Sequence, residues 1–111
     1  MSDPFETLSD EQLAQTHGGF SSDLRWAMGR ARSYGLRITS TTGGKHARHS
    51  YHYAGRAFDA AGSPRAMRAF FSEMRHHHPT EMFYDPMGRV KHGRFSARPL
   101  GGHRNHVHLA F

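Results

Sequence analysis

The last seven residues, NHVHLAF, constrain the fold more tightly than any other stretch of the chain. Their apolar and polar side chains alternate, which is the period of a β-strand with two different faces. Val107, Leu109 and Phe111 form one face, which must lie on a hydrophobic core. His106 and His108 form the other face. The chain is therefore expected to build a sheet that is packed on one side and carries histidines on the other.

The composition contains enough apolar residues for one hydrophobic core. The chain has 111 residues, of which 36% are apolar, and its mean hydropathy is −0.75. A domain of this length buries roughly two-thirds of its unfolded surface, and eight Phe and four Tyr add large buried area per residue. We expect a mobile lead-in over residues 1–20, one domain over residues 21–111, and a monomer.

Local patterns predict two helices and several strands. Helical spacing of apolar residues predicts a helix over 22–34. Ser63 followed by Pro64 predicts the start of a second helix, which ends near 76–78. Strands are expected over 36–40, 56–60 and 81–85, in a hairpin around 90–95, and over 105–111. This order predicts an α+β fold, with a small antiparallel sheet and helices on one side.

Charge and cysteine content limit the classes of function. The chain has no Cys, which excludes disulfides and thiolate metal sites. Its formal net charge of +6 favours an anionic partner, such as nucleic acid, anionic lipid or a cell-wall polymer. No apolar run is long enough to span a bilayer, and the acidic start MSDPFETLSDEQ lacks the pattern of a signal peptide. We expect synthesis in the cytoplasm, with another route of delivery if the protein acts elsewhere.

Eleven histidines make a metal site the leading hypothesis, because histidine is the commonest metal ligand. In the stretch SYHYAGRAFD, Gly55 and Ala57 leave room for His52 to approach Asp59. With a histidine from the terminal strand, they supply two imidazoles and one carboxylate. This set leaves one tetrahedral position of a zinc ion open, as in catalytic rather than structural sites. Such a site activates water and polarises a carbonyl group.

Other histidines have weaker claims to such a site. His46 and His49, in a polar loop with Lys45 and Arg48, form a further candidate cluster. The three consecutive histidines at 76–78 end a predicted helix and point in different directions. They are better explained as partners of the helix dipole than as metal ligands.

Ser50, His52, Gly55, Ala57 and Asp59 fill the pattern S-x-H-x-x-G-x-A-x-D. This pattern resembles that of the M15-type zinc D-Ala-D-Ala peptidases, which include phage endolysins that cut peptidoglycan stem peptides. The terminal H-x-H is similar to that of the wider group that joins lysostaphin, the D-Ala-D-Ala metallopeptidases and the hedgehog signalling domain. The stretches EMFYDP and GGHRNHVHLAF resemble phage-associated members of this group.

The resemblance covers residues 22–111 and implies a hedgehog-like, D-Ala-D-Ala peptidase-like fold. It implies that His52, Asp59 and His108 are the zinc ligands. It also implies that His106 assists catalysis by holding water or stabilising the oxyanion. The function that follows is hydrolysis of peptide bonds in peptidoglycan stem peptides or cross-links, as an antibacterial endopeptidase or a D-Ala-D-Ala carboxypeptidase. Such an enzyme would act at the bacterial cell wall after release or delivery.

The sequence departs from this family at the general base. Asn105 stands where many M15 members carry Glu or Asp, and an amide binds water but does not accept a proton at neutral pH. His106 is the first candidate to replace that base, because a neutral imidazole is a competent base near pH 7. His103 and Glu81 are the next candidates.

The family also uses a basic residue upstream of the first ligand to hold a substrate carboxylate or the oxyanion. Arg37, Lys45 and Arg48 are the candidates for this role, and none matches the motif position clearly.

Two other functions stay open at this point. Asn105 is compatible with a module that retains zinc and binds the cell wall without catalysis. The stretch HVHLAF is also similar to the His-hydrophobic-His strand of nucleases that nick single-stranded DNA through a tyrosine. Tyr34 is the only tyrosine on a predicted helix, and it lies at the helix end. Nucleic acid is therefore the less favoured partner.

Overall fold

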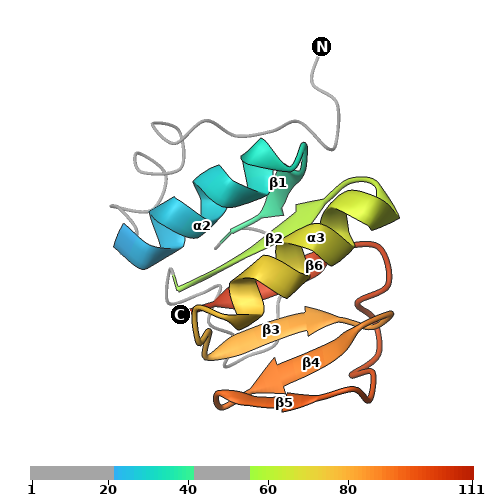
Figure 1. Ribbon diagram of the computed structural model, residues 1–111. Coiled ribbons are helices and arrows are strands. Elements are labelled where there is room, and N and C mark those ends of the chain that lie inside the picture. Colours follow the sequence, from blue (N-terminus) through green and yellow to red (C-terminus); the bar gives the residue numbers. More distant parts are fainter. Residues whose placement is uncertain (1–21, 42–55) are drawn as a thin grey trace.

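The computed structural model describes residues 22–41 and 56–111, which form two helices and a six-stranded sheet (Figure 1). The helices are α2 (Ser22–Ser33) and α3 (Pro64–Arg75). The strands are β1 (Arg37–Ser40), β2 (Ala57–Ala61), β3 (Glu81–Tyr84), β4 (Gly88–Lys91), β5 (Arg94–Ser96) and β6 (Val107–Ala110). All neighbouring strands are antiparallel. The predicted α+β class is thus confirmed.

The strand order is β1-β2-β6-β3-β4-β5, so the last strand of the chain lies in the middle of the sheet. β6 pairs with β2 on one side and with β3 on the other. β6 thus has a hydrogen-bonded strand along each of its edges, and all four of its residues are buried. The terminal segment therefore holds together two halves of the sheet that lie far apart in sequence.

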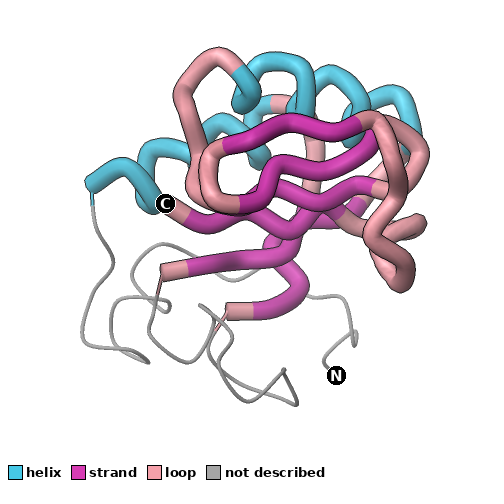
Figure 2. Tube along the Cα trace, turned by 90° about the horizontal axis from the view of Figure 1, so that it is seen from below, coloured by secondary structure: helices cyan, strands magenta, loops and turns pink. Residues whose placement is uncertain are grey.

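Both helices cover the same face of the sheet (Figure 2). The alternation predicted for the strands places Phe58, Leu109 and Met82 on this face, where all three are fully buried. The apolar stripes of the helices complete the core, with Leu24, Ala27, Met28 and Ala31 from α2 and Met67, Phe70, Phe71 and Met74 from α3. We call the opposite face, which α2 and α3 do not cover, the second face of the sheet.

The predicted start of α3 is confirmed in detail. The Ser63 side-chain oxygen accepts a hydrogen bond from the Ala66 backbone N–H at 3.1 Å, and Pro64 opens the helix. The cap satisfies one of the backbone donors that a helix start leaves unpaired, and proline loses no hydrogen bond at this position.

Glu73 links the two helices above the core. Its carboxylate accepts hydrogen bonds from Arg30 Nε at 2.8 Å, from Arg30 Nη2 at 2.6 Å and from the Tyr34 hydroxyl at 3.0 Å. The hydrogen bonds from Arg30 lower the pKa of Glu73, with a further contribution from Tyr34, and outweigh the opposing effect of burial. The two-point contact fixes α3 against α2.

Gly88 is required where β4 meets β5. Its φ angle is +114°, and a Cβ at this position would clash with the carbonyl oxygen of Ser96. Glycine therefore lets β5 lie close against β4 at the edge of the sheet.

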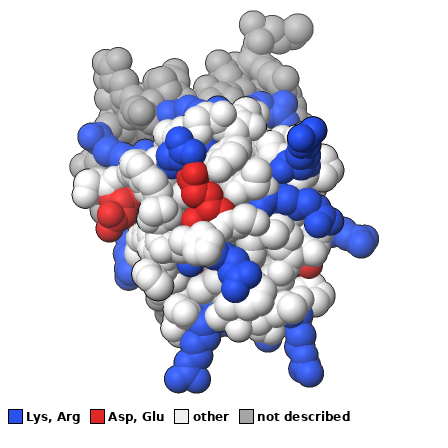
Figure 3. All heavy atoms as spheres, in the orientation of Figure 1, with Lys and Arg blue, Asp and Glu red and all other residues white. Residues whose placement is uncertain are grey.

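Several predictions fall outside the described residues: the lead-in over 1–20 and the loop residues Lys45, His46, Arg48, His49 and His52. Within the described ranges, neither helix is long and apolar enough to cross a membrane. Figure 3, drawn in the orientation of Figure 1, shows Lys and Arg spread over that side of the molecule, with Asp and Glu between them.

Replacing Glu73 by Gln should lower the free energy of unfolding by about 1 kcal/mol at neutral pH, since the pair is partly solvent-exposed and screened. A carboxylate with a lowered folded-state pKa stabilises above its unfolded pKa, and this stabilisation is lost as the pH falls through the folded value. Urea unfolding measured from pH 7 to pH 3 should therefore show a smaller loss of stability for Glu73→Gln than for the wild type. Parallel pH profiles for both proteins would contradict this assignment.

Candidate functional site

The pairing register brings a row of side chains together on the second face. Asp59 on β2 lies opposite His108 on β6, and His108 lies opposite Phe83 on β3. Directly opposed residues of an antiparallel sheet share a face. The neighbouring pair Phe58 and Leu109 points to the helices instead. Asp59 and His108, which are 49 residues apart in the chain, therefore meet on the second face.

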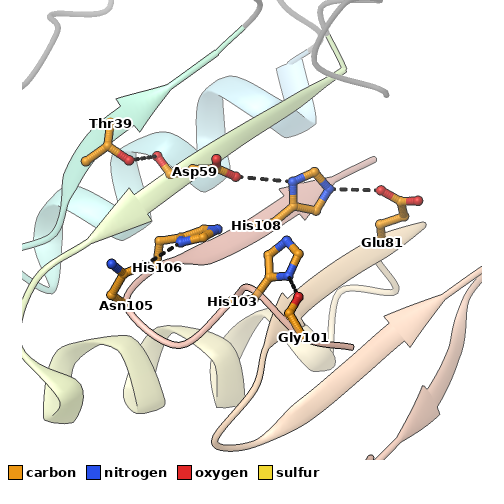
Figure 4. A network of polar contacts seen from close by, with 8 residues as sticks. All are labelled: Thr39, Asp59, Glu81, Gly101, His103, Asn105, His106 and His108. Atoms are coloured by element: carbon orange, nitrogen blue, oxygen red, sulfur yellow. Dashed lines mark hydrogen bonds and ion pairs between the residues drawn. The ribbon is translucent and has the colours of Figure 1, made fainter. Parts of the chain in front are cut away.

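His108 is held from three directions, and Figure 4 shows two of the contacts, those with Asp59 and Glu81. Its Nδ1 lies 3.2 Å from Asp59 Oδ1, and its Nε2 lies 2.9 Å from Glu81 Oε1. The Phe83 ring stacks on the imidazole, with 4.9 Å between centroids and an interplanar angle of 13°. The His108 side chain is only 6% exposed. These contacts leave the ring a single orientation, which a binding or catalytic group requires.

Both ring nitrogens of His108 face carboxylate oxygens, which only accept hydrogen bonds, so both nitrogens carry protons. Burial lowers the pKa of His108, but the contacts with Asp59 and Glu81 outweigh it and raise the pKa above its ordinary value. The hydrogen bond from His108 in turn lowers the pKa of Glu81, although burial opposes this shift. In the absence of a metal ion, the three groups form a buried cation between two anions.

Two more histidines lie beside this cluster (Figure 4). The His106 Nδ1–H donates to Asn105 Oδ1 at 2.8 Å, and the His103 Nδ1–H donates to the Gly101 carbonyl at 2.8 Å. The His103 ring centroid lies 4.9 Å from that of His106 and 6.0 Å from that of His108. Because Nδ1 is the donor in both rings, Nε2 of each neutral ring remains a proton acceptor.

The electrostatic setting of His106 differs from that of His108. Burial is the main cause that lowers the pKa of His106, with help from His103 and His108, while Asp59 opposes the shift. The surroundings thus shift the pKa values of these neighbouring imidazoles in opposite directions.

The position of His106 corrects the sequence prediction. The terminal strand was expected over 105–111, with His106 and His108 side by side on it, but β6 begins at Val107. His106 ends the preceding loop and contacts His103. The loop turns through Gly101 and Gly102, which have φ angles of +100° and +75°. Because of this bend, β6 begins later than predicted, and His103 lies beside the cluster.

Asp85 fixes that loop. Its Oδ1 accepts hydrogen bonds from the backbone N–H groups of Leu100 and Gly101, and its Oδ2 accepts one from the N–H of His103. The Asp85 N–H also donates to the His103 carbonyl at 2.8 Å. Burial raises the pKa of Asp85, but the three backbone donors together outweigh it and lower the pKa. Sequence reasoning missed this role, although an Asp directly between a strand and Pro86 is a typical turn signal.

The remaining predicted residues lie as follows. Glu81 belongs to the cluster through His108. Arg37 is exposed at the start of β1, opposite Ala61. His77, at the end of α3, packs edge-on against Trp26 at 4.5 Å and takes no part in the cluster.

The Asp59–His108 pair has the donor atoms of a metal site. Two ligands on a tetrahedral zinc ion with bonds of about 2.0–2.2 Å are separated by roughly 3.3–3.6 Å, slightly more than the 3.2 Å between Asp59 Oδ1 and His108 Nδ1. A carboxylate on the second nitrogen, here Glu81, is the usual support of a metal-bound histidine. Within residues 22–41 and 56–111, no group of three His, Asp or Glu side chains is placed to hold a metal ion. A third ligand must come from elsewhere, and the predicted one, His52, lies outside these ranges.

No family model, no curated protein and no solved structure matches this chain. The resemblance to M15-type peptidases therefore stays a prediction, and functional inference depends on the residues and their geometry.

Asp85→Ala should loosen the loop that carries His103 and His106. Three charge-assisted hydrogen bonds to the backbone are lost, which we expect to cost about 1–2 kcal/mol of unfolding free energy. Nuclear magnetic resonance should show the His103 and His106 ring signals broadened or shifted, while those of His77 stay in place. Asp85→Asn, which keeps one acceptor oxygen, should give an intermediate effect. Unchanged ring signals in Asp85→Ala would show that the loop keeps its conformation without the hydrogen bonds to Asp85.

Proposed function

We propose that this protein is a zinc-dependent peptidase that hydrolyses peptide bonds in bacterial peptidoglycan stem peptides or cross-links. The observation that carries the proposal is the convergence of Asp59 and His108 at metal-ligand spacing, with Glu81 on the second nitrogen of His108. The S-x-H-x-x-G-x-A-x-D pattern, which ends at Asp59, adds His52 as the third ligand. The protein would act at the cell wall after release from the cytoplasm, as a monomer.

In this proposal, His52, Asp59 and His108 hold zinc, which activates water and polarises the scissile carbonyl when it is bound. Glu81 accepts a hydrogen bond from His108 Nε2, and this contact directs Nδ1 towards Asp59. The engagement of Glu81 with His108 favours a positioning role over its predicted role as a general base. Phe83 fixes the ring plane of His108.

Proton transfer is assigned to the histidine pair in the loop between β5 and β6, residues 97–106. His106 Nε2 is an acceptor because its Nδ1–H is occupied by Asn105. Asn105 thus supports His106 instead of acting as the base itself. His106 can take a proton from the attacking water and pass it to the leaving amine. His103, whose ring lies 4.9 Å from that of His106, is placed to stabilise the oxyanion.

Asp59→Ala and His108→Ala should each weaken zinc binding by more than about 100-fold and abolish the release of peptides from purified sacculi. Glu81→Gln should weaken zinc binding by roughly 10- to 100-fold, because the support of His108 is reduced. Zinc affinity is measured by calorimetry, and peptide release by mass spectrometry.

His76→Ala removes an exposed histidine at the end of α3 and is the matched control for these substitutions. It should keep full zinc affinity and activity. Full activity of a zinc-free His108→Ala protein would falsify the peptidase proposal.

His106→Ala should lower kcat by about 10²- to 10⁴-fold without loss of zinc, because only the proton acceptor is removed. Asn105→Ala should have a smaller effect on kcat, while Asn105→Asp, which keeps an acceptor for the His106 Nδ1–H, should remain active. These rates are followed on a synthetic stem peptide.

A zinc-retaining wall-binding module is the second candidate, since Asn105 replaces the usual acidic base. An inactive wild type that gains activity through Asn105→Asp would favour this candidate. The nuclease alternative is disfavoured, because the Tyr34 hydroxyl bonds Glu73 on the helix side of the sheet, away from His108 on the second face.

A further inference from the structure

The second face continues beyond the histidine cluster onto β4 and β5. Phe83 lies opposite Arg89, Glu81 lies opposite Lys91, and Lys91 lies opposite Arg94. Opposed residues share a face, so these three cations lie on the same face as His108. We call Arg89, Lys91 and Arg94 the basic strip.

The neighbours of the strip confirm this orientation. Phe95, which follows Arg94, faces the helices, because the guanidinium of Arg75 on α3 lies 3.6 Å from its ring centre. Val90, between Arg89 and Lys91, belongs to the core. Since side chains alternate along a strand, Arg94, Arg89 and Lys91 point away from the helices.

The charges of the strip are not matched by partners in the described part of the chain, where Arg89, Lys91 and Arg94 form no ion pair. The charge of Lys91 contributes to the lowered pKa of Glu81, but the Glu81 carboxylate is hydrogen-bonded to His108. Lys91 and Arg94 directly oppose each other, and like charges in that arrangement destabilise a sheet. Fold stability therefore gives no reason for the strip, whereas an anionic ligand would.

Strand spacing sets the distance between the strip and the candidate site. Neighbouring strands lie about 4.8 Å apart. Arg89 is two strands from His108, and Arg94 is three, which gives roughly 10–14 Å. An extended peptide advances about 3.3–3.6 Å per residue. A group three or four residues from a bond held at His108 thus reaches the strip.

We propose that the basic strip binds a free carboxylate of the substrate peptide, about three or four residues from the scissile bond. This inference rests on the proposed peptidase function for the kind of substrate. A continuous polyanion such as nucleic acid fits less well, because Asp59 and Glu81 on the same face would repel phosphates that pass from the strip to the histidines. A peptide places its neutral bond at the histidines and its carboxylate at the strip.

The test uses the zinc-loaded full chain and two synthetic stem peptides that differ only in one carboxyl group, which is free in one and amidated in the other. Calorimetry should show the acid bound about tenfold more tightly than the amide by the wild type. The double variant K91Q/R94Q should bind both peptides with the affinity of the wild type for the amide. R68Q, which removes an exposed charge from α3, should behave as the wild type.

K91Q/R94Q should also melt no lower than the wild type, because it removes a like-charge pair. Equal affinity of the wild type for the two peptides, or no binding of either, overturns the inference. The inference is also overturned if K91Q/R94Q weakens the binding of a single-stranded oligonucleotide but not the binding of the peptides. Carboxylate-dependent binding without hydrolysis supports the strip but counts against the peptidase proposal. Hydrolysis that does not depend on the carboxylate supports the peptidase proposal but counts against the role of the strip.

Discussion

The imidazole of His108, bound between the carboxylates of Asp59 and Glu81, is the contact on which the rest of the candidate site depends. It joins three adjacent strands, and it is buried where an unpaired charge would be costly. Removing either carboxylate would leave only one of these two hydrogen bonds that orient the ring, beside the stacked Phe83. The same arrangement suits a metal ion, because one nitrogen is supported while the other faces a carboxylate ligand.

The sheet separates stability from chemistry by its two faces. Apolar side chains on one face form the core with α2 and α3, and the other face carries the histidines, the carboxylates and the basic strip. A chain with 36% apolar residues can afford only one such core. Because side chains alternate along a strand, the residues next to each core residue lie on the second face. Within the described residues, the candidate site therefore lies on the face of the sheet that neither helix covers.

Loop geometry completes the site with His103 and His106. Asp85 accepts hydrogen bonds from three backbone N–H groups of the loop between β5 and β6, residues 97–106. His103 and His106 of this loop reach the edge of the cluster from outside the sheet. Asn105 accepts a hydrogen bond from the His106 Nδ1–H and so helps to orient that ring. The loop therefore adds two histidines to a candidate site whose centre is fixed by the strands.

The sequence by itself determined the elements: Ser63-Pro64 starts α3, the apolar stripes mark both helices, and the alternation in HVHLAF separates Val107 and Leu109 from His108. These signals are local, because they depend on capping, periodicity and backbone preference. Only the tertiary structure decided that β6 lies between β2 and β3, which brings Glu81 to His108, and that a bend before Val107 places His106 against His103. Strand order and register depend on hydrogen bonds and packing between segments far apart in the chain, and no local pattern encodes that choice.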